Sequence, residues 1–146
     1  MKVIGLSGGI CSGKSSVTQI CHDLGGYIIN ADLLGHQAYA PGTDCYHDLV
    51  NQFGEEIVSS DGSINRRALG GIVFSDESKL KLLNQIVWPR IRNLIEIELN
   101  ELRERGVQIV VLEAAILIEA GWQDIVDEIW VIETEQFIFF LLFLIP

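Results

Sequence analysis

Basic residues are scarce in this sequence. Its 146 residues contain 10 Lys and Arg against 20 Asp and Glu, which gives a formal net charge of −10. Neutralising the phosphates of DNA or RNA requires a basic face. We therefore expect no nucleic acid partner. Every Lys and four of the six Arg lie within residues 1–95, so that part of the chain could still bind a small anionic substrate.

Cysteine and long apolar runs are also rare. The three cysteines, Cys11, Cys21 and Cys45, form no C-x-x-C pair, which argues against a disulfide framework or a zinc site and favours a reducing compartment. No signal peptide precedes the glycines that follow Lys2. The longest apolar run, residues 137–145, would span about 14 Å as a helix, whereas a bilayer core measures about 30 Å. We expect an intracellular protein, cytoplasmic or mitochondrial, without a membrane span.

The first thirty residues predict a βαβ unit. Lys2–Leu6 has the apolar character of a buried strand, and glycines follow it. Apolar residues then recur with helical spacing from Val17 to Leu24, and Gly25-Gly26 ends that helix. Tyr27–Asn30 is the second predicted strand. Strand, glycine loop, helix and strand in this order indicate parallel pairing.

The rest of the chain predicts further helices and two more strands. We expect a three-layer α/β/α sandwich with a parallel sheet, because Val107–Leu112 is a nearly continuous apolar run, typical of a strand covered on both faces. Asn65 is the expected cap of a helix that begins at Arg66, and Pro89 is expected to separate a helix over 76–88 from one over 90–105. The remaining expected elements are helices over 46–53 and 114–120 and a strand over 129–132.

The glycine-rich segment after the first strand matches the P-loop pattern G-x-x-x-x-G-K-S. Glycines allow backbone N–H groups to curl around a phosphate, and the N-terminus of the following helix also favours an anion. In such a loop Lys14 contacts the β- and γ-phosphates of ATP, and the Ser15 hydroxyl is placed for Mg²⁺. The predicted nucleotide-binding residues are Gly8, Gly9, Ile10, Cys11, Ser12, Gly13, Lys14, Ser15 and Ser16.

Two carboxylates follow strands and are candidates for catalysis or metal binding. Asp32 follows the second strand, where it could accept a proton from a hydroxyl or help hold Mg²⁺. It could equally be a solvated turn residue or the N-cap of a helix at Leu33. Glu113 follows the strand over 107–112, where P-loop enzymes place an acid that orders Mg²⁺.

The arginines and histidines carry weaker signals. Arg66-Arg67 could bind phosphate oxygens or could be a surface pair. Arg90 and Arg92 have the same two interpretations. We assign His22 to the polar face of the first helix. His36 and His47 have no ligand spacing and receive no role.

Several of these segments, in order, resemble the dephospho-CoA kinase family. The resemblance covers residues 1–136. Residues 86–89 and 113–122 are most similar to the kinase half of the animal bifunctional CoA synthase, which implies that this chain could be part of a larger bifunctional CoA synthase. The other segments that carry the resemblance are Ile4–Ser15, Ile29–Asp32, Gly35, Pro41–Gly42, Ile64–Leu69 and Phe74.

The resemblance implies a reaction and roles for individual residues. The family uses ATP to phosphorylate the ribose 3′-hydroxyl of dephospho-CoA, which gives coenzyme A. Asp32 would be the base on that hydroxyl, and Lys14 with its loop would hold the ATP phosphates. Arg66 and the Trp88-Pro89 pair would lie toward dephospho-CoA.

The sequence departs from the family after Gln136. Residues 137–146 are an apolar tail, whereas the family continues with a lid helix that carries arginines and then a last strand. We therefore expect residues 1–136 to form an incomplete P-loop kinase domain with reduced activity. Two other functions remain open: a different small-molecule P-loop kinase, and a nucleotide-binding fragment without catalysis.

Overall fold

The structure is a computed structural model that describes residues 1–9 and 12–133. The chain divides into two compact units. Unit 1 comprises residues 1–31 together with the chain from Glu96 onward, and unit 2 comprises Asp32–Ile95. The apolar run over 137–145 lies outside the described residues. Among the described residues, no helix combines the length and the apolar character needed to cross a bilayer.

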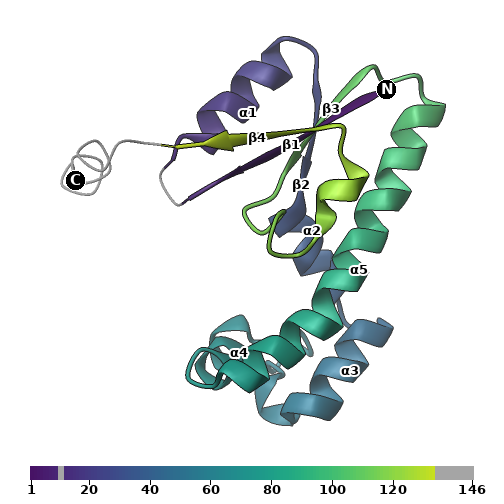
Figure 1. The fold of residues 1–146 in the computed structure, drawn as a ribbon. Helices are drawn as coiled ribbons and strands as arrows, with labels where there is room; N and C mark the ends of the chain where they lie inside the picture. Colours follow the sequence, from purple (N-terminus) through teal and green to yellow (C-terminus); the bar gives the residue numbers. More distant parts are fainter. Residues whose placement is uncertain (10–11, 134–146) are drawn as a thin grey trace. The chain divides into compact units, whose positions relative to one another are not determined.

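Unit 1 is built on a parallel sheet of four strands, in the order β2-β3-β1-β4 (Figure 1). The strands are β1 (Lys2–Gly8), β2 (Tyr27–Asn30), β3 (Ile109–Glu113) and β4 (Glu128–Ile132). β1 pairs with β3 from Lys2↔Ile109 to Leu6↔Glu113, and with β4 on its other side. The predicted parallel sheet is confirmed.

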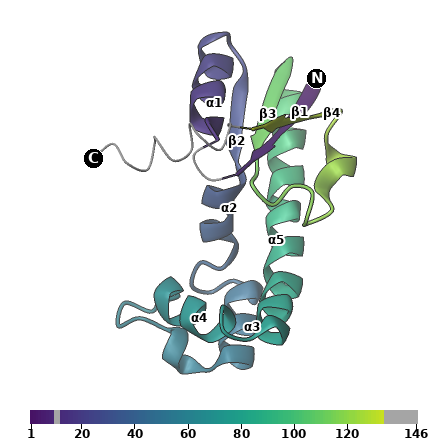
Figure 2. The ribbon, with the colours of Figure 1, turned by 60° about the vertical axis from the view of Figure 1, so that its left-hand side comes forward.

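Helices cover both faces of this sheet. α1 (Lys14–Asp23) lies against one face, and the Glu96–Glu104 part of α5 (Glu77–Glu104) lies against the other (Figures 1 and 2). This confirms the three-layer α/β/α architecture. The unit 1 core consists of apolar side chains from the strands and from the segments on either side, among them Leu6, Ile29, Leu102, Val110, Leu112, Leu117 and Trp122, each at most 2% exposed.

One local prediction in unit 1 is wrong. Residues 115–121 form consecutive turns rather than a helix over 114–120, although hydrogen bonds such as Ala120 N–H to Ile116 O, at 2.8 Å, give them helix-like contacts. The predicted first helix is confirmed as α1, whose apolar residues are only partly covered: Ile20 is 59% exposed, and Leu24, at the C-cap, is 84% exposed. β4 is an edge strand, and most of its residues are exposed.

Unit 2 is helical. It contains α2 (Ala31–Ala38, whose first residue belongs to unit 1), α3 (Asp44–Phe53), the 3₁₀ turn η1 (Glu55–Ile57), α4 (Arg66–Val73) and the first part of α5. Side chains cap two of these helices. Thr43 Oγ1 accepts from the Tyr46 N–H at 3.1 Å, and Asn65 Oδ1 accepts from the Ala68 N–H at 3.0 Å. The predicted Asn65 cap is confirmed.

α5 is one continuous helix, which corrects the predicted break at Pro89. Proline has no N–H and disfavours a helix interior. The helix continues because its apolar positions keep a four-residue spacing through the proline and form one buried stripe. This stripe consists of Val87, Ile91, Ile95 and Leu99, each at most 8% exposed.

Leu112 and Ile109 offer a test of where the sheet is stabilised, because both lie in β3. Leu112 is 0% exposed and Ile109 is 48% exposed. We expect Leu112→Ala to lower the free energy of unfolding by about 2–5 kcal/mol, since it leaves a cavity in the core. Ile109→Ala should cost about 1 kcal/mol or less. Urea unfolding measures both values, and equal losses would contradict the assignment of Leu112 to the core.

Candidate functional site

The glycine loop begins at the carboxyl end of β1, and the geometry at Gly8 and at Gly13 favours glycine. A Cβ on Gly8 would lie 2.5 Å from the carbonyl oxygen of Ile132 and 2.7 Å from Ser12 Oγ, so no side chain fits there. Gly13 has a φ of +94°, in the left-handed region. It occupies the N-cap position of α1, where no side chain of the described residues caps the helix.

Lys14 closes the loop. Its ammonium group donates to the carbonyl oxygens of Gly8, at 2.6 Å, and Gly9, at 3.0 Å. This places a positive charge directly beside the uncapped N-terminus of α1. Ser12 Oγ is buried and has no hydrogen-bond partner among the described residues. A cation, an uncapped helix N-terminus and an unsatisfied hydroxyl together suit a bound phosphate.

The structure describes some of the other predicted loop residues and not others. Ser15 and Ser16 are exposed in the first turn of α1. Gly9 borders open space, with no atom within 4 Å of a Cβ built on it. The predictions for Ile10 and Cys11 lie outside the described residues.

Glu113 lies at the carboxyl end of β3, opposite Leu6 of β1 and Asn30 of β2. The Thr18 hydroxyl lies 3.1 Å from Glu113 Oε2 and 2.9 Å from Lys14 O. Thr18 therefore connects the phosphate-loop helix to the carboxylate that the sequence suggested for Mg²⁺. Sequence reasoning missed this residue because its partner lies 95 positions away.

No group of three or more His, Cys, Asp or Glu side chains in the described part of the chain could hold a metal ion. Mg²⁺ does not require such a group, because it commonly uses one or two protein oxygens together with substrate phosphates and water. The oxygens of Ser15 and Glu113 fit that limited role.

Asp32 is the second residue of α2, directly after β2. It lies inside the first turn of the helix, so it is not the N-cap of a helix starting at Leu33. Its carboxylate is exposed. The loop belongs to unit 1, whereas Asp32 belongs to unit 2.

Arg66 and Trp88 line the same cavity in unit 2, which we call the apolar cavity. Its volume is about 210 Å³, and apart from Arg66 and Asn84 its walls consist of Gly70 and of apolar or aromatic side chains. Pro89 instead lines a separate cavity of about 580 Å³ together with Asp44, Asp48 and Arg90. Trp88 and Pro89, which the sequence resemblance places together toward dephospho-CoA, therefore line different cavities.

Two residues that received no role from the sequence surround Arg66. Its guanidinium lies against the ring of His36, with Nη1 3.3 Å from Nδ1 and closer still to Nε2. Burial raises the pKa of the Tyr39 hydroxyl, although the nearby Arg66 charge lowers it. The contact with the His36 ring therefore holds the Arg66 guanidinium in place.

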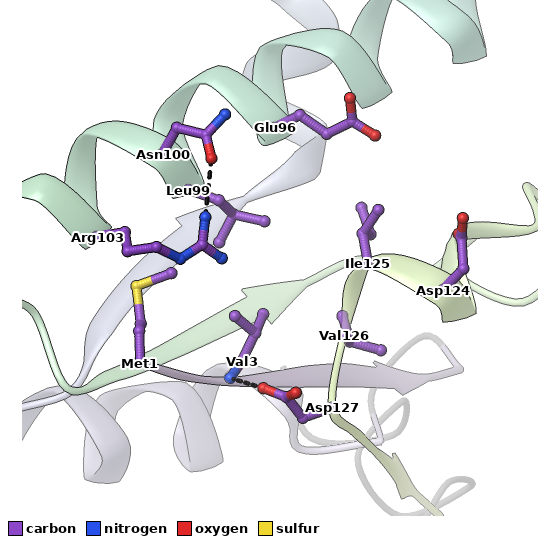
Figure 3. A pocket seen from close by; sticks show the side chains of 10 residues that line it. All are labelled: Met1, Val3, Glu96, Leu99, Asn100, Arg103, Asp124, Ile125, Val126 and Asp127. Carbon is purple, nitrogen blue, oxygen red and sulfur yellow. Dashed lines mark hydrogen bonds between the residues drawn. The ribbon is translucent and has the colours of Figure 1, made fainter.

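A further cavity of about 390 Å³ lies in unit 1 at the start of β1 (Figure 3). Two of the polar side chains that line it, Arg103 and Asp127, form hydrogen bonds within the protein. Arg103 donates to Asn100 Oδ1 at 2.8 Å, and Asp127 Oδ2 accepts from the Val3 N–H at 2.7 Å. Since the phosphate loop follows the other end of β1, this cavity is distinct from it. Its lining residues are Met1, Val3, Glu96, Leu99, Asn100, Arg103, Asp124, Ile125, Val126 and Asp127.

The sequence profile described as dephospho-CoA kinase matches residues 2–137. The chain belongs to the dephospho-CoA kinase family. It is 49% identical over 136 residues to the dephospho-CoA kinase of Geobacter sulfurreducens, covering 93% of this chain and 69% of the relative. It is 44% identical over 133 residues to that of Moorella thermoacetica, covering 90% of this chain and 63% of the relative.

Solved structures share the fold of this chain. The Thermus thermophilus protein TT1252 superposes with a TM-score of 0.75 at 32% identity, covering 90% of this chain and 65% of that one. The dephospho-CoA kinase of Campylobacter jejuni has a TM-score of 0.70 at 24% identity, covering 90% of this chain and 66% of that one, and supports the fold alone.

The expected likeness to an animal bifunctional CoA synthase finds no support in these comparisons. The relatives named above are bacterial proteins called dephospho-CoA kinase. They give no support to a mitochondrial location or to a bifunctional partner. An intracellular location stays a prediction.

Lys14→Ala tests whether the loop binds nucleotide. The substitution removes the ammonium group that the loop carbonyls hold, and a hydrogen bond to a charged group contributes about 1.5–3 kcal/mol. We therefore expect the affinity for ATP·Mg²⁺ to fall at least about tenfold, measured by titration calorimetry. Lys79→Ala, at an exposed lysine of unit 2, should leave the affinity unchanged. Equal affinities for wild type and Lys14→Ala would mean that ATP binds elsewhere.

Proposed function

We propose that this protein transfers the γ-phosphoryl group of ATP to the ribose 3′-hydroxyl of dephospho-CoA, giving coenzyme A and ADP. The observation that carries the proposal is the complete phosphate-loop sequence pattern, with Lys14 held on the carbonyl oxygens of Gly8 and Gly9, in a chain of the dephospho-CoA kinase family. The chain spans less than two thirds of the length of several relatives, such as 63% of the Moorella protein. The activity of the whole relatives is therefore a proposal for this chain.

In this reaction the loop binds and orients the donor. The backbone N–H groups after Gly8 and the Lys14 ammonium hold the β- and γ-phosphates. The acceptor 3′-oxygen forms a bond to the γ-phosphorus, and the bond between that phosphorus and the β,γ-bridging oxygen breaks. Phosphoryl transfer gains mainly from such positioning and from charge stabilisation.

Asp32 is the residue that accepts the proton of the 3′-hydroxyl. Its carboxylate follows the carboxyl end of β2, which is the edge of a parallel sheet where ligands bind. A carboxylate oxygen placed next to an attacking hydroxyl can accept its proton. No second base is required for the atoms to balance.

Mg²⁺ would be held by Ser15 and Glu113. When bound, it neutralises charge that develops on the β- and γ-phosphate oxygens. Thr18 orients Glu113 through the contact at 3.1 Å, and Ser15 lies next to Lys14 in the first turn of α1.

Arg66 and Trp88 provide the acceptor side. An arginine fork is suited to the diphosphate of dephospho-CoA, and the cavity that both side chains line offers apolar surface next to this charge. Pro89 was expected to share this role, but it lines the other cavity. Its part in acceptor binding stays a prediction.

Turnover of the full chain with ATP·Mg²⁺ and dephospho-CoA tests the proposal, with mass spectrometry to identify 3′-phosphorylated product. We expect ADP release to depend on dephospho-CoA. Nucleosides and nucleotides serve as competing acceptors. A preference for one of these would indicate a different P-loop kinase. ATP binding without transfer to any acceptor would identify a non-catalytic nucleotide-binding protein.

Asp32→Asn should keep ATP affinity and lower kcat by about 10²–10⁴-fold, because the amide keeps the shape of the side chain but cannot accept the proton. Asp44→Asn is a matched control, since Asp44 also lies in the first turn of a unit 2 helix. Steady-state turnover and calorimetry measure the two effects. A kcat within threefold of wild type would show that Asp32 has another role.

Thr18→Val should raise the Mg²⁺ concentration required for half-maximal ATP binding by about tenfold, because residues that orient a metal ligand typically have effects of this size. Thr18→Ser keeps the hydroxyl and should change it little. ATP titrations at a series of Mg²⁺ concentrations measure the shift. If valine has no effect, Glu113 does not contribute to Mg²⁺ binding.

A further inference from the structure

One side of α2 carries two exposed polar residues in succession. Asp32 lies in the first turn of the helix, and His36 follows it four positions later, in the last turn. Residues four positions apart lie next to each other on the same side of a helix. Asp32 is the proposed base, so the His36 ring lies one turn beyond the base.

The Arg66 guanidinium reaches this end of α2 from another helix, α4. Its Nη1 lies 3.3 Å from Nδ1 of His36 and closer still to Nε2. A second observation agrees with this placement. Burial raises the pKa of the Tyr39 hydroxyl, and the Arg66 charge lowers it, although Tyr39 directly follows α2. All of these residues belong to unit 2, so the guanidinium lies beside the C-terminal part of α2.

The stability of α4 does not explain where Arg66 lies. Arg66 is the first residue of α4, and the first turn of this helix contains no acidic residue. A positive charge near a helix N-terminus is unfavourable, because the positive end of the helix dipole lies there. An exposed arginine also has many rotamers and loses this freedom when it is held in one of them. The contact with His36 therefore supplies a restraint that α4 itself does not provide.

The spacing along α2 suits the two reacting ends of one ribose. An α-helix rises about 1.5 Å per residue, so Asp32 and His36 are about 6 Å apart along the axis. This separation is comparable with the distance across one ribose, from its 3′-hydroxyl to its 5′-phosphate. A base at one position and a cation at the other can therefore engage both groups of the same nucleotide.

We propose that His36 is a positioning residue, whose ring holds the Arg66 guanidinium one helical turn from Asp32, so that the acceptor's 5′-diphosphate and 3′-hydroxyl engage both groups together. This inference rests on the proposed function. Among the described residues, His36 is not one of those that line the apolar cavity. It acts through Arg66 and does not need to touch the acceptor.

The test measures steady-state turnover of the full chain at saturating ATP·Mg²⁺ while the concentration of dephospho-CoA is varied. His36→Phe keeps an aromatic ring but has no nitrogen to contact the guanidinium. We expect it to raise the KM for dephospho-CoA by about tenfold, the effect of losing one hydrogen bond to a charged group. The kcat and the KM for ATP should stay within about threefold of wild type, because only acceptor binding is weakened.

Two further variants separate positioning from a general structural role. His36→Gln places an amide oxygen within reach of the guanidinium and should restore a KM close to that of wild type. His47→Phe is the matched control, since His47 is also an exposed histidine on a unit 2 helix, and it should leave the KM unchanged. A double-mutant cycle then adds Arg66→Met. In that background His36→Phe should have no further effect, because the residue through which it acts is gone.

The outcomes separate this inference from the proposed function. If wild type phosphorylates dephospho-CoA and His36→Phe leaves the KM unchanged, or raises it equally with and without Arg66, His36 does not position Arg66 and only the present inference fails. It also fails if His36→Phe lowers kcat and ATP affinity together, since that pattern indicates a structural role. If wild type transfers no phosphoryl group to dephospho-CoA, the proposed function fails and this inference fails with it.

Discussion

The pairing of β1 with β3 and β4 is the interaction on which the rest of unit 1 depends. β1 is an inner strand of the sheet, and the phosphate loop starts where its pairing ends, at Gly8 opposite Ile132. The close approach of these two residues excludes any side chain at position 8. The Lys14 ammonium donates to the carbonyl oxygens of Gly8, the last residue of β1, and of Gly9. Sheet pairing therefore fixes one of the two oxygens that hold the charge that phosphate requires.

Features encoded in neighbouring residues could be predicted from the sequence, and features that depend on distant partners could not. The strands and the Asn65 cap follow from short patterns, and the structure confirms them. The continuous α5 does not, because burial along the whole helix outweighs the local cost of Pro89. Trp88 and Pro89 line different cavities because successive helical residues point about 100° apart. Thr18 and His36 received no role because their partners, Glu113 and Arg66, lie 95 and 30 positions away.

The charge distribution also bears on function. A net charge of −10 repels anions such as ATP and dephospho-CoA at long range. Binding therefore relies on local cations, of which Lys14 in unit 1 and Arg66 in unit 2 are both held by hydrogen bonds to their surroundings. Salt screens the long-range repulsion more than it screens such short contacts, because screening acts beyond about 10 Å at 0.1 M ionic strength. The acidic surface thus favours ligands that can reach a fixed cation over anions in general.

The two hydrogen bonds of Lys14 have a consequence for the entropy of nucleotide binding. A lysine side chain ordinarily loses about 2 kcal/mol of rotamer freedom when it is immobilised. Here the ammonium group is already fixed on two loop carbonyls, so that freedom is lost when the chain folds and not when a phosphate arrives. Binding then needs only a change of acceptor, from backbone oxygen to phosphate oxygen. The loop is preorganised for its ligand, and its own backbone provides the acceptors that keep it so.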